Sequence, residues 1–329
     1  TSTLKNILIT GGAGFIGSNL VRALNERDER NILLVDHLVN GRKVHNIADL
    51  DIADYMDKAQ FIEKIESPAF LNDVRAVFHQ GACSSTTEWD GQFVMTNNYD
   101  YSKRLLHWCI AKNAAFIYAS SASVYGNGEH GFRVDRKCEH PINMYAYSKF
   151  QFDQYVRQLL PNTKSQIVGF RYFNVYGPRE QHKGSMSSTA FHFNRQIIEQ
   201  KRAKLFAGCD GLADGEQKRD FVYVDDVVDV NLWFLDHPDQ HGIYNIGTGQ
   251  AETFNTVARA VIDWHKEGDI EYISFPEHLK GAYQSYTQAD ISGLRRAGYT
   301  KEFLSVKEGV ARYLNWLNSQ KFKYKIHYG

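Results

Sequence analysis

The chain has 329 residues, which at about 150 residues per domain is enough for two domains and a sizeable core. Lysine plus arginine and aspartate plus glutamate each total 38, so the formal net charge is zero. The excess of positive charge on which general nucleic-acid binding draws is therefore absent. Hydrophobic residues make up 43% and aromatic residues 13%, which excludes the disordered class.

Membrane, export and metal signals are missing from the sequence. No apolar run approaches the roughly 18 residues that a membrane span needs, and no charged, apolar and small-residue leader stands at the start. The four cysteines, Cys83, Cys109, Cys138 and Cys209, form no C-x-x-C pair, so neither disulfides nor a zinc site are predicted. We expect a soluble protein with free thiols in a reducing cytoplasm, without a metal, membrane or nucleic-acid partner.

Short apolar runs rich in β-forming residues alternate with helical patterns through the first half of the chain. The expected strands are residues 6–10, 31–36, 76–80, 115–120 and 166–172. The expected helices are residues 14–27, 98–112 and 144–160, and Pro161 stops the last of them. A parallel sheet covered by helices on both faces requires this alternation, so we predict a doubly wound, Rossmann-like α/β fold.

The rhythm changes after Gly177 and Pro178. A long helical pattern covers residues 188–200, and a Gly/Asp-rich stretch at 208–215 is typical of an exposed loop. Residues 221–230 and 242–247 look like further strand and helix material able to rejoin the sheet. We therefore predict a dinucleotide-binding domain over residues 1–175, rejoined by segments near 218–250, and a smaller, discontinuous substrate domain over 176–217 and 251–329.

A glycine-rich turn, T-G-G-A-G-F-I-G at residues 10–17, directly follows the first expected strand and opens the first helix. Glycine permits the tight turn and the close approach of backbone to a pyrophosphate, whose charge then sits at the helix N-terminus. Gly11, Gly14 and Gly17 are the glycines expected to do this. Asp36 ends the second strand, where an acid can hold the adenine ribose.

The choice between the two nicotinamide dinucleotides is less clear from the residues. Asp36 favours the free ribose hydroxyl of NAD. Arg42 and Lys43, just beyond it, can neutralise the extra phosphate of NADP, although both can also belong to an ordinary solvated loop. These residues alone leave both cofactors open.

A second signal is Tyr145-Ala-Tyr-Ser-Lys149 near the start of a helix, where a spacing of four places the phenol and the ammonium on one face. A free tyrosine has a pKa of about 10, and a nearby lysine cation favours the phenolate. The pair is therefore a candidate general base. Ser121, at the end of a preceding strand, can orient a substrate oxygen beside the phenol.

With these three motifs in this order, the chain resembles the extended short-chain dehydrogenase/reductases over nearly its whole length. The resemblance does not choose the reaction. The sugar-nucleotide dehydratases of that superfamily carry an Asp-Glu pair after the orienting hydroxyl, whereas here Ala122 and Ser123 follow Ser121. The resemblance therefore implies epimerisation or simple reduction rather than loss of water.

Finer segments are similar to one family within that superfamily, the ADP-L-glycero-D-manno-heptose 6-epimerases. They are G-A-C-S-S-T-T-E-W-D at 81–90, R-Y-F-N-V-Y-G-P-R-E-x-H-K-G-S-M at 171–186, K-R-D-F-V-Y-V at 218–224 and Q-A-D at 288–290. This resemblance implies NADP rather than NAD as cofactor, an ADP-heptose as substrate, a place in lipopolysaccharide core precursor synthesis, and a homo-oligomer, reported as a pentamer for that family.

The same resemblance implies roles position by position. Beside the turn glycines, cofactor contacts are implied for Phe15, Ile16, Asp36, His37, Lys43, Lys58, Gln80, Gly81, Ala82, Cys83, Ser84, Asn97, Tyr145, Lys149, Val175 and Lys183. Substrate contacts are implied for Asn174, Ser185, His192, Phe206, Ala207, Gly208, Cys209, Arg219 and Tyr283. Two departures stand out: His37 replaces an expected Asn near the added phosphate, and residues 211–217 lengthen the loop before Arg219.

The implied reaction is oxidation at C6 of the heptose, turning of the ketone and reduction on its other face, without net redox. Inverting a stereocentre needs proton handling on two faces. Tyr145, with Ser121 and Lys149, serves one face, and the resemblance implies that Lys183 is the second acid/base. Without the resemblance, Lys183 would be an ordinary solvated loop lysine. A sugar-nucleotide reductase, a UDP-hexose 4-epimerase and a non-catalytic dinucleotide sensor remain as alternatives, and the presence of Ser121, Tyr145 and Lys149 together argues against the sensor.

Overall fold

The computed structural model describes residues 6–83, 88–209, 211–279 and 286–319. Within them, the main sheet has seven strands in the order β11-β6-β5-β4-β1-β2-β3, and all neighbours are parallel. The strands are β1 (Asn6–Thr10), β2 (Ile32–Asp36), β3 (Asp54–Asp57), β4 (Val74–His79), β5 (Ala115–Ser121), β6 (Ile167–Tyr172) and β11 (Gly242–Ile246). This arrangement confirms the predicted doubly wound α/β fold class.

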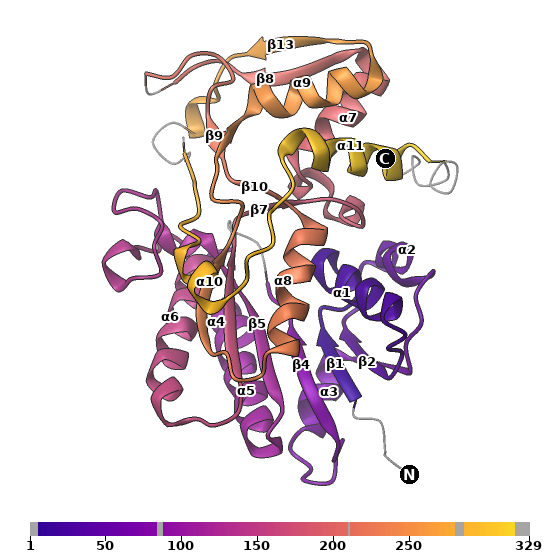
Figure 1. Cartoon of the computed structure of the whole chain (residues 1–329), viewed down its shortest axis with the longest axis vertical. Helices are drawn as coiled ribbons and strands as arrows, with labels where there is room; N and C mark the ends of the chain where they lie inside the picture. Colours follow the sequence, from indigo (N-terminus) through magenta and orange to yellow (C-terminus); the bar gives the residue numbers. More distant parts are fainter. Residues whose placement is uncertain (1–5, 84–87, 210, 280–285, 320–329) are drawn as a thin grey trace.

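Helices cover both faces of this sheet, as Figure 1 shows. They are α1 (Phe15–Glu26), α3 (Lys58–Lys64), α5 (Tyr101–Lys112), α6 (Met144–Leu159) and α8 (Val224–Asp236), with the shorter α2 (Val44–Ile47) and α4 (Gly91–Met95) in connections. Successive side chains of a strand point to opposite faces. Ile7 and Ile9 accordingly pack in one core with residues of α1 and α8, whereas Leu8 packs in the other with residues of α5 and α6.

A smaller region lies beyond one end of the main sheet (Figure 1). It holds the parallel pair β8 (Arg202–Phe206) and β13 (Asp269–Ile273), with α7 (Thr189–Gln200), α9 (Phe254–His265) and α11 (Val306–Leu317) around its own core. Two short pairs lie between the regions: β7 (Asn174–Tyr176) with β10 (Phe221–Tyr223), and β9 (Lys218–Arg219) with β12 (Glu252–Thr253). Helix α10 (Ser292–Ala297) packs against β11.

Short helical turns fill several connections. They are η1 (Gly41–Lys43), the π-helical η2 (Thr96–Asp100), η3 (Ala122–Tyr125), η4 (Arg136–Cys138), η5 (Leu160–Asn162), η6 (Gln181–Met186) and η7 (Glu277–Leu279). Two of these turns matter below. Turn η3 follows β5 and carries the residues after Ser121, and η6 carries Lys183.

The five strands expected in the first half are all present, and the expected strand at 242–247 joins the edge of the main sheet beside β6 as β11. Strand β3 was not predicted. Its sequence Asp-Tyr-Met-Asp has no apolar run because it is an edge strand whose first two residues are exposed, and only Met56 packs against the core. The division of the chain into two domains stays a prediction.

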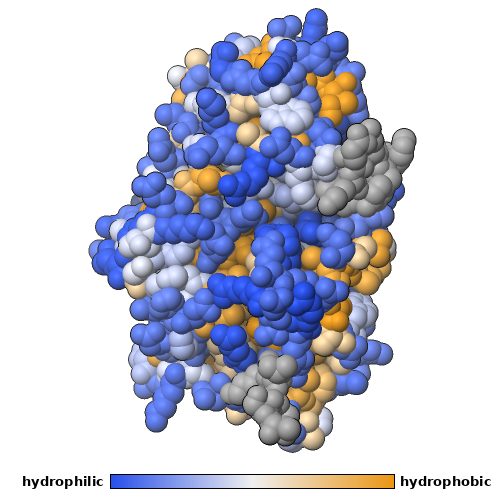
Figure 2. All heavy atoms as spheres, turned by 45° about the vertical axis from the view of Figure 1, so that its right-hand side comes forward, coloured by the Kyte–Doolittle hydropathy of each residue, from blue (hydrophilic) through white to orange (hydrophobic). Residues whose placement is uncertain are grey.

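No helix in the described part of the chain is long and apolar enough to cross a membrane. On the face that Figure 2 shows, hydrophilic residues predominate and apolar residues gather only in small patches. Among the described residues, no group of three or more His, Cys, Asp or Glu side chains is arranged to hold a metal ion.

Candidate functional site

The glycine-rich turn connects β1 to α1 with almost no room for side chains. Gly11 has a φ of +62°, and a Cβ added there would lie 2.7 Å from the amide nitrogen of Gly81. A Cβ on Gly17 would lie 2.2 Å from the carbonyl oxygen of Gly11. The turn therefore brings bare backbone to the N-terminus of α1, which is the arrangement that receives a pyrophosphate.

A cavity of about 470 Å³ extends from this turn along the ends of the central strands. Fifteen of the residues expected to contact the cofactor line it: Gly11, Gly14, Phe15, Ile16, Gly17, Asp36, His37, Lys43, Lys58, Gln80, Gly81, Ala82, Tyr145, Lys149 and Lys183. Tyr101, Tyr172, His182 and Met186 also line it and were not singled out from the sequence. We call this space the dinucleotide cavity.

The remaining expected cofactor contacts in the described part of the chain, Cys83, Asn97 and Val175, do not line this cavity. Asn97 accepts a hydrogen bond of 2.9 Å from Nζ of Lys58, which does line the wall. The backbone N–H of Cys83 donates to the side-chain oxygen of Asn98 at 2.7 Å. Val175 lines a second cavity, and Ser84 lies outside the described residues.

Asp36 and Lys43 form an ion pair at one end of the dinucleotide cavity, with Nζ 3.2 Å from Oδ1. The Asp36 carboxylate also accepts from the backbone N–H groups of Ala13 at 2.9 Å and His37 at 2.7 Å, so its orientation is fixed. A carboxylate held here can accept a ribose hydroxyl, and the ammonium beside it can meet a ribose phosphate. The geometry leaves both NAD and NADP open.

A polar ligand also fits the cavity wall at Gln80. Its side-chain oxygen accepts from the Tyr172 hydroxyl at 3.1 Å, but its buried Nε2 has no hydrogen-bond partner among the described residues. An unmet buried donor costs about 1–3 kcal/mol. A dinucleotide, which carries acceptors along its whole length, would satisfy it.

Ser121 and Tyr145 lie next to each other, and Tyr145 lines the dinucleotide cavity whereas Ser121 lines neither cavity. Ser121 ends β5 and caps η3, where its hydroxyl oxygen accepts from the backbone N–H of Ser123 at 3.1 Å. Tyr145 lies in the first turn of α6, whose N-cap Asn143 accepts from Ala146 at 2.8 Å. The Tyr145 and Ser121 hydroxyls are hydrogen-bonded to each other. The two side chains therefore lie side by side, and their role in orienting a substrate oxygen stays a prediction.

The charge state of Tyr145 differs from the expectation drawn from its lysine neighbour. Burial raises the pKa of Tyr145, and the hydrogen bond to Ser121 only partly opposes this. The Nζ atom of Lys149 lies 6.0 Å from the centre of the Tyr145 ring and donates instead to the carbonyl of Ala119 at 2.9 Å. Burial also lowers the pKa of Lys149 to about 8, against the opposing charge of Asp153. Desolvation thus outweighs the lysine's effect on the phenol.

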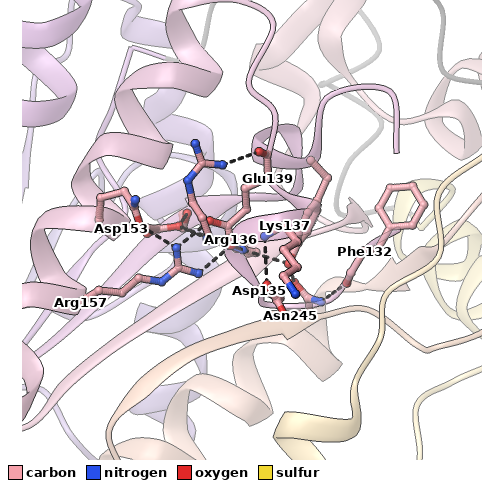
Figure 3. A network of polar contacts seen from close by, with 12 residues as sticks. Phe132, Asp135, Arg136, Lys137, Glu139, Asp153, Arg157 and Asn245 are labelled. Carbon is pink, nitrogen blue, oxygen red and sulfur yellow. Dashed lines mark hydrogen bonds and ion pairs between the residues drawn. The ribbon is translucent and has the colours of Figure 1, made fainter. Parts of the chain in front are cut away.

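A buried ionic network holds α6 against the sheet. The Asp153 carboxylate lies one helical turn beyond Lys149 and accepts from Tyr118 and Ser120 at 2.7 Å each and from Arg171 at 3.0 Å. Glu139 accepts from Arg171 at 2.7 Å and from both terminal nitrogens of Arg157 at 2.6 Å; Figure 3 shows Asp153, Glu139 and Arg157 together. This network fixes the helix that carries Tyr145.

Lys183 lies where the dinucleotide cavity meets a second cavity of about 270 Å³, and it lines both. Its Nζ is 5.2 Å from the centre of the Phe15 ring, at the start of α1. Burial lowers the pKa of Lys183, and Glu180 opposes the shift. A lysine in this position can exchange protons with a ligand that bridges the two cavities.

The structure brings only part of the expected substrate set to this place. Asn174 lines the second cavity beside Lys183. The other described members line neither cavity: Ser185, His192, Phe206, Ala207, Gly208, Cys209 and Arg219. Tyr283 lies outside the described residues. Their substrate roles stay predictions.

The lengthened loop is tied to its surroundings. The backbone N–H of Gly208 donates to Asp214 at 2.8 Å, and that of Gly215 donates to the carbonyl of Phe206 at 3.0 Å. The Gln217 side chain donates to the Ala207 carbonyl at 3.2 Å. Residues 206–209, for which substrate contacts were expected, are therefore held in place by the loop that follows them.

The chain is similar in sequence and in structure to known proteins. A model of the NAD dependent epimerase/dehydratase family matches residues 7–247. The chain is similar to ADP-L-glycero-D-manno-heptose-6-epimerase of Helicobacter pylori, with 29% identity over 96% of both chains and a TM-score of 0.81. It is also similar to UDP-glucose 4-epimerase of Thermotoga maritima with UDP-glucose, with 28% identity over 98% of this chain and 100% of that one and a TM-score of 0.80.

An NAD-dependent NDP-hexosamine 5,6-dehydratase of tunicamycin biosynthesis matches with 25% identity over 96% of this chain and 99% of that one, and a TM-score of 0.76. Epimerases and a dehydratase therefore share this architecture. The same fold therefore serves different reactions of sugar nucleotides, so the reaction has to be argued from the residues of the site.

Proposed function

The chain belongs to the NAD dependent epimerase/dehydratase family, and on that premise we propose that it inverts C6 of ADP-D-glycero-D-manno-heptose to give ADP-L-glycero-D-manno-heptose. The similar heptose epimerase of Helicobacter pylori supports this substrate. So do the four segments that resemble heptose 6-epimerases, of which the one at 171–186 contains Lys183. The reaction would serve lipopolysaccharide core precursor synthesis.

The observation that carries the proposal is the set of titratable groups at the two cavities. Tyr145 and Lys183 both face the dinucleotide cavity, and Lys183 also faces the second one. Among the described residues that line either cavity, Asp36 is the one carboxylate, and it is paired with Lys43. Loss of water needs a carboxyl acid and base near the sugar, so this set favours epimerisation over dehydration.

Each group has a role that follows from its position. The Ser121 hydroxyl, bonded to the phenol of Tyr145, orients the reacting oxygen of the sugar. Tyr145 exchanges a proton with that oxygen on one face. Lys183, on the wall that the second cavity shares, exchanges it on the other. A sugar that turns between two proton-transfer groups can end with either configuration.

The dinucleotide fits the residues present, as the tight glycine turn and the unmet donor of Gln80 indicate. When bound, it would supply reversible removal of hydrogen from the carbinol carbon. Asp36 and Lys43 would hold its adenosine end, and Lys149 its nicotinamide ribose. We propose NADP as the cofactor because the resemblance to the heptose 6-epimerases implies it, and Lys43, which is paired with Asp36 at 3.2 Å, could meet its extra phosphate.

The proposal extends to assembly and location. We propose a homo-oligomer, with a pentamer as the specific state, and no nucleic-acid or membrane partner. A cytoplasmic location follows from the cysteine usage of the sequence and stays a prediction.

Incubation of the purified protein with ADP-D-glycero-D-manno-heptose tests the function. We expect both C6 epimers to appear, without consumption of added NADPH, when the products are separated by chromatography. UDP-glucose is the matched control substrate and should stay unchanged. Stoichiometric use of NADPH would identify a reductase instead, and conversion of UDP-glucose to UDP-galactose would identify a hexose 4-epimerase.

Lys183→Met tests the second acid/base. The variant should lose epimerisation by about two orders of magnitude or more, the usual range for a positioned acid or base, because one face of the reacting carbon loses its proton-transfer group. It should still bind dinucleotide and ADP-sugar, which equilibrium dialysis would measure. Turnover close to the wild-type rate would make Lys183 a loop lysine and remove the main catalytic support for the heptose assignment.

A further inference from the structure

His182 lies immediately before Lys183 in η6 and lines the dinucleotide cavity, although nothing in the sequence analysis singled it out. Its Nδ1 is 3.0 Å from the side-chain nitrogen of Asn46, at the end of the short helix α2. The same Asn46 nitrogen donates to the carbonyl of Ala13, in the glycine-rich turn, at 2.9 Å. One amide therefore connects the histidine to the phosphate-binding turn.

These contacts decide which ring nitrogen of His182 carries the proton. The Ala13 carbonyl can only accept, so the Asn46 side chain must present its NH₂ group to it. The second N–H of that group then points at Nδ1 of His182, which must accept. The proton of the neutral ring is consequently on Nε2, and His182 is a fixed N–H donor.

The charges around His182 keep the ring neutral. Burial together with the nearby ammonium groups of Lys43 and Lys183 lowers the pKa of His182 to about 4, and Asp36 only partly opposes this. Protonation would also put a hydrogen on Nδ1, against the NH₂ group of Asn46. A neutral donor between two lysines adds a hydrogen bond without adding charge repulsion.

The loop that carries His182 is clamped to the adenosine side of the cavity. Both terminal nitrogens of Arg179 donate to the carboxylate of Asp49 at 2.8 Å, and one of them also donates to the Asn46 carbonyl. Arg179 is buried and has a φ of +75°, a left-handed conformation that persists only where the surroundings hold it. On α1, the Asn19 side chain donates to the Pro178 carbonyl at 2.9 Å. His182 is thus a positioned group and not a free loop side chain.

We infer that Nε2 of His182 donates a hydrogen bond to a phosphoryl oxygen of the bound dinucleotide, an inference that rests on the dinucleotide binding of the proposed function. His182 lines a cavity that also presents the N-terminus of α1, Lys43 and Lys183, and its Nδ1 is already engaged by Asn46, which leaves Nε2 for a ligand. All of these favour an anion. Two phosphoryl groups have this chemistry, the pyrophosphate common to NAD and NADP and the ribose phosphate of NADP alone.

Three substitutions separate the role of Nε2 from that of the ring. His182→Leu removes both nitrogens. His182→Gln places an amide N–H near the position of Nε2, whereas His182→Asn places one near Nδ1 and leaves the Nε2 position empty. His130→Leu, at an exposed histidine that does not line the cavity, is the matched control.

The readout is the dissociation constant for NAD and for NADP, measured by calorimetry on the full chain whose folding has been checked by thermal melting. We expect His182→Leu and His182→Asn to bind about tenfold more weakly, and His182→Gln to return to within about threefold of wild type. Equal losses for both nucleotides identify the pyrophosphate as the acceptor, and a loss confined to NADP identifies the ribose phosphate.

The failures are distinguishable. Wild-type protein that binds neither nucleotide would overturn the proposed function and this inference with it. If the wild type binds and His182→Leu binds equally well, the inference alone is overturned. If the leucine variant does not fold, His182→Asn takes its place in this comparison. A glutamine variant as weak as the asparagine variant would likewise exclude Nε2 as the donor.

Discussion

Replacing Asp153 by alanine tests whether the buried ionic network beneath α6 holds the fold and the catalytic helix. Asp153 and Arg171 are both fully buried, and the guanidinium lies 3.0 Å from the carboxylate. The alanine removes that partner and also the acceptor of the Tyr118 and Ser120 hydroxyls. Breaking a buried pair by removing one partner costs about 3–5 kcal/mol. Arg171 keeps its ion pair with Glu139 at 2.7 Å, so its charge stays partly compensated and we expect a loss at the lower end of this range.

Urea unfolding of the wild type and the variant measures this loss, with fluorescence and circular dichroism as probes. The matched control is Asp236→Ala. Its ion pair with Arg27 is also 3.0 Å long, but the two side chains are 41% and 45% exposed, so its loss should cost less than about 1 kcal/mol. If Asp153→Ala lowers the free energy of unfolding by no more than the control does, the network is not the anchor that we describe.

The remaining predictions concern the cofactor, the phenol and the pH dependence of stability. Lys43→Ala should weaken NADP binding about ten- to a hundredfold, because it removes a charge-assisted hydrogen bond to the ribose phosphate, while NAD binding changes little; equal losses in calorimetry would argue against NADP preference. Tyr145→Phe should lower turnover by two to four orders of magnitude and leave the dissociation constant of the dinucleotide within about threefold; unchanged turnover would remove the tyrosine from the mechanism. Burial raises the pKa of Asp226 to about 6 in the folded protein, so the contribution of this residue to stability falls as pH rises from about 4 through 6. Asp226→Asn should then be more stable than the wild type by up to about 3 kcal/mol at pH 8 and equally stable near pH 4. Urea unfolding at pH 8 and pH 4 measures this difference. Equal stabilities at both pH values would show that the folded protein stabilises the charged carboxylate as well as water does.

The main sheet was predictable because its strands are buried on both faces. Residues 7–9 read as a continuous apolar run, since Ile7 and Ile9 enter one core and Leu8 the other. The same reasoning fails for β3, where Asp54 and Tyr55 are exposed and no hydrophobic pattern is needed. It also misses the π-helical turn before α5, because the side chain of Asn98 in that turn is used to bind the backbone of Cys83.

The site was predictable where the chemistry lies in consecutive residues. The glycine turn and the spacing between Tyr145 and Lys149 are local sequence patterns. The residues of both patterns line the dinucleotide cavity. Asp153 follows Lys149 by four residues, so the spacing of one helical turn was a signal that it lies on the same face. His182 had no such signal, because its tautomer depends on Asn46, 136 residues away in the chain.

Burial gives the two proposed proton-transfer groups complementary forms. It raises the pKa of Tyr145 and lowers that of Lys183, so it favours the neutral form of each: a phenol, which can donate a proton, and an amine, which can accept one. On the proposed reaction, the first half requires a base for the hydroxyl proton and the second half an acid for the returning oxygen. The directions of these pKa shifts suit Lys183 to the first half and Tyr145 to the second. The hydrogen bond between Tyr145 and Ser121 opposes the upward shift of the phenol pKa. The serine therefore keeps the phenol closer to the range in which it can both give up a proton and regain it, as an epimerase that also runs in reverse requires.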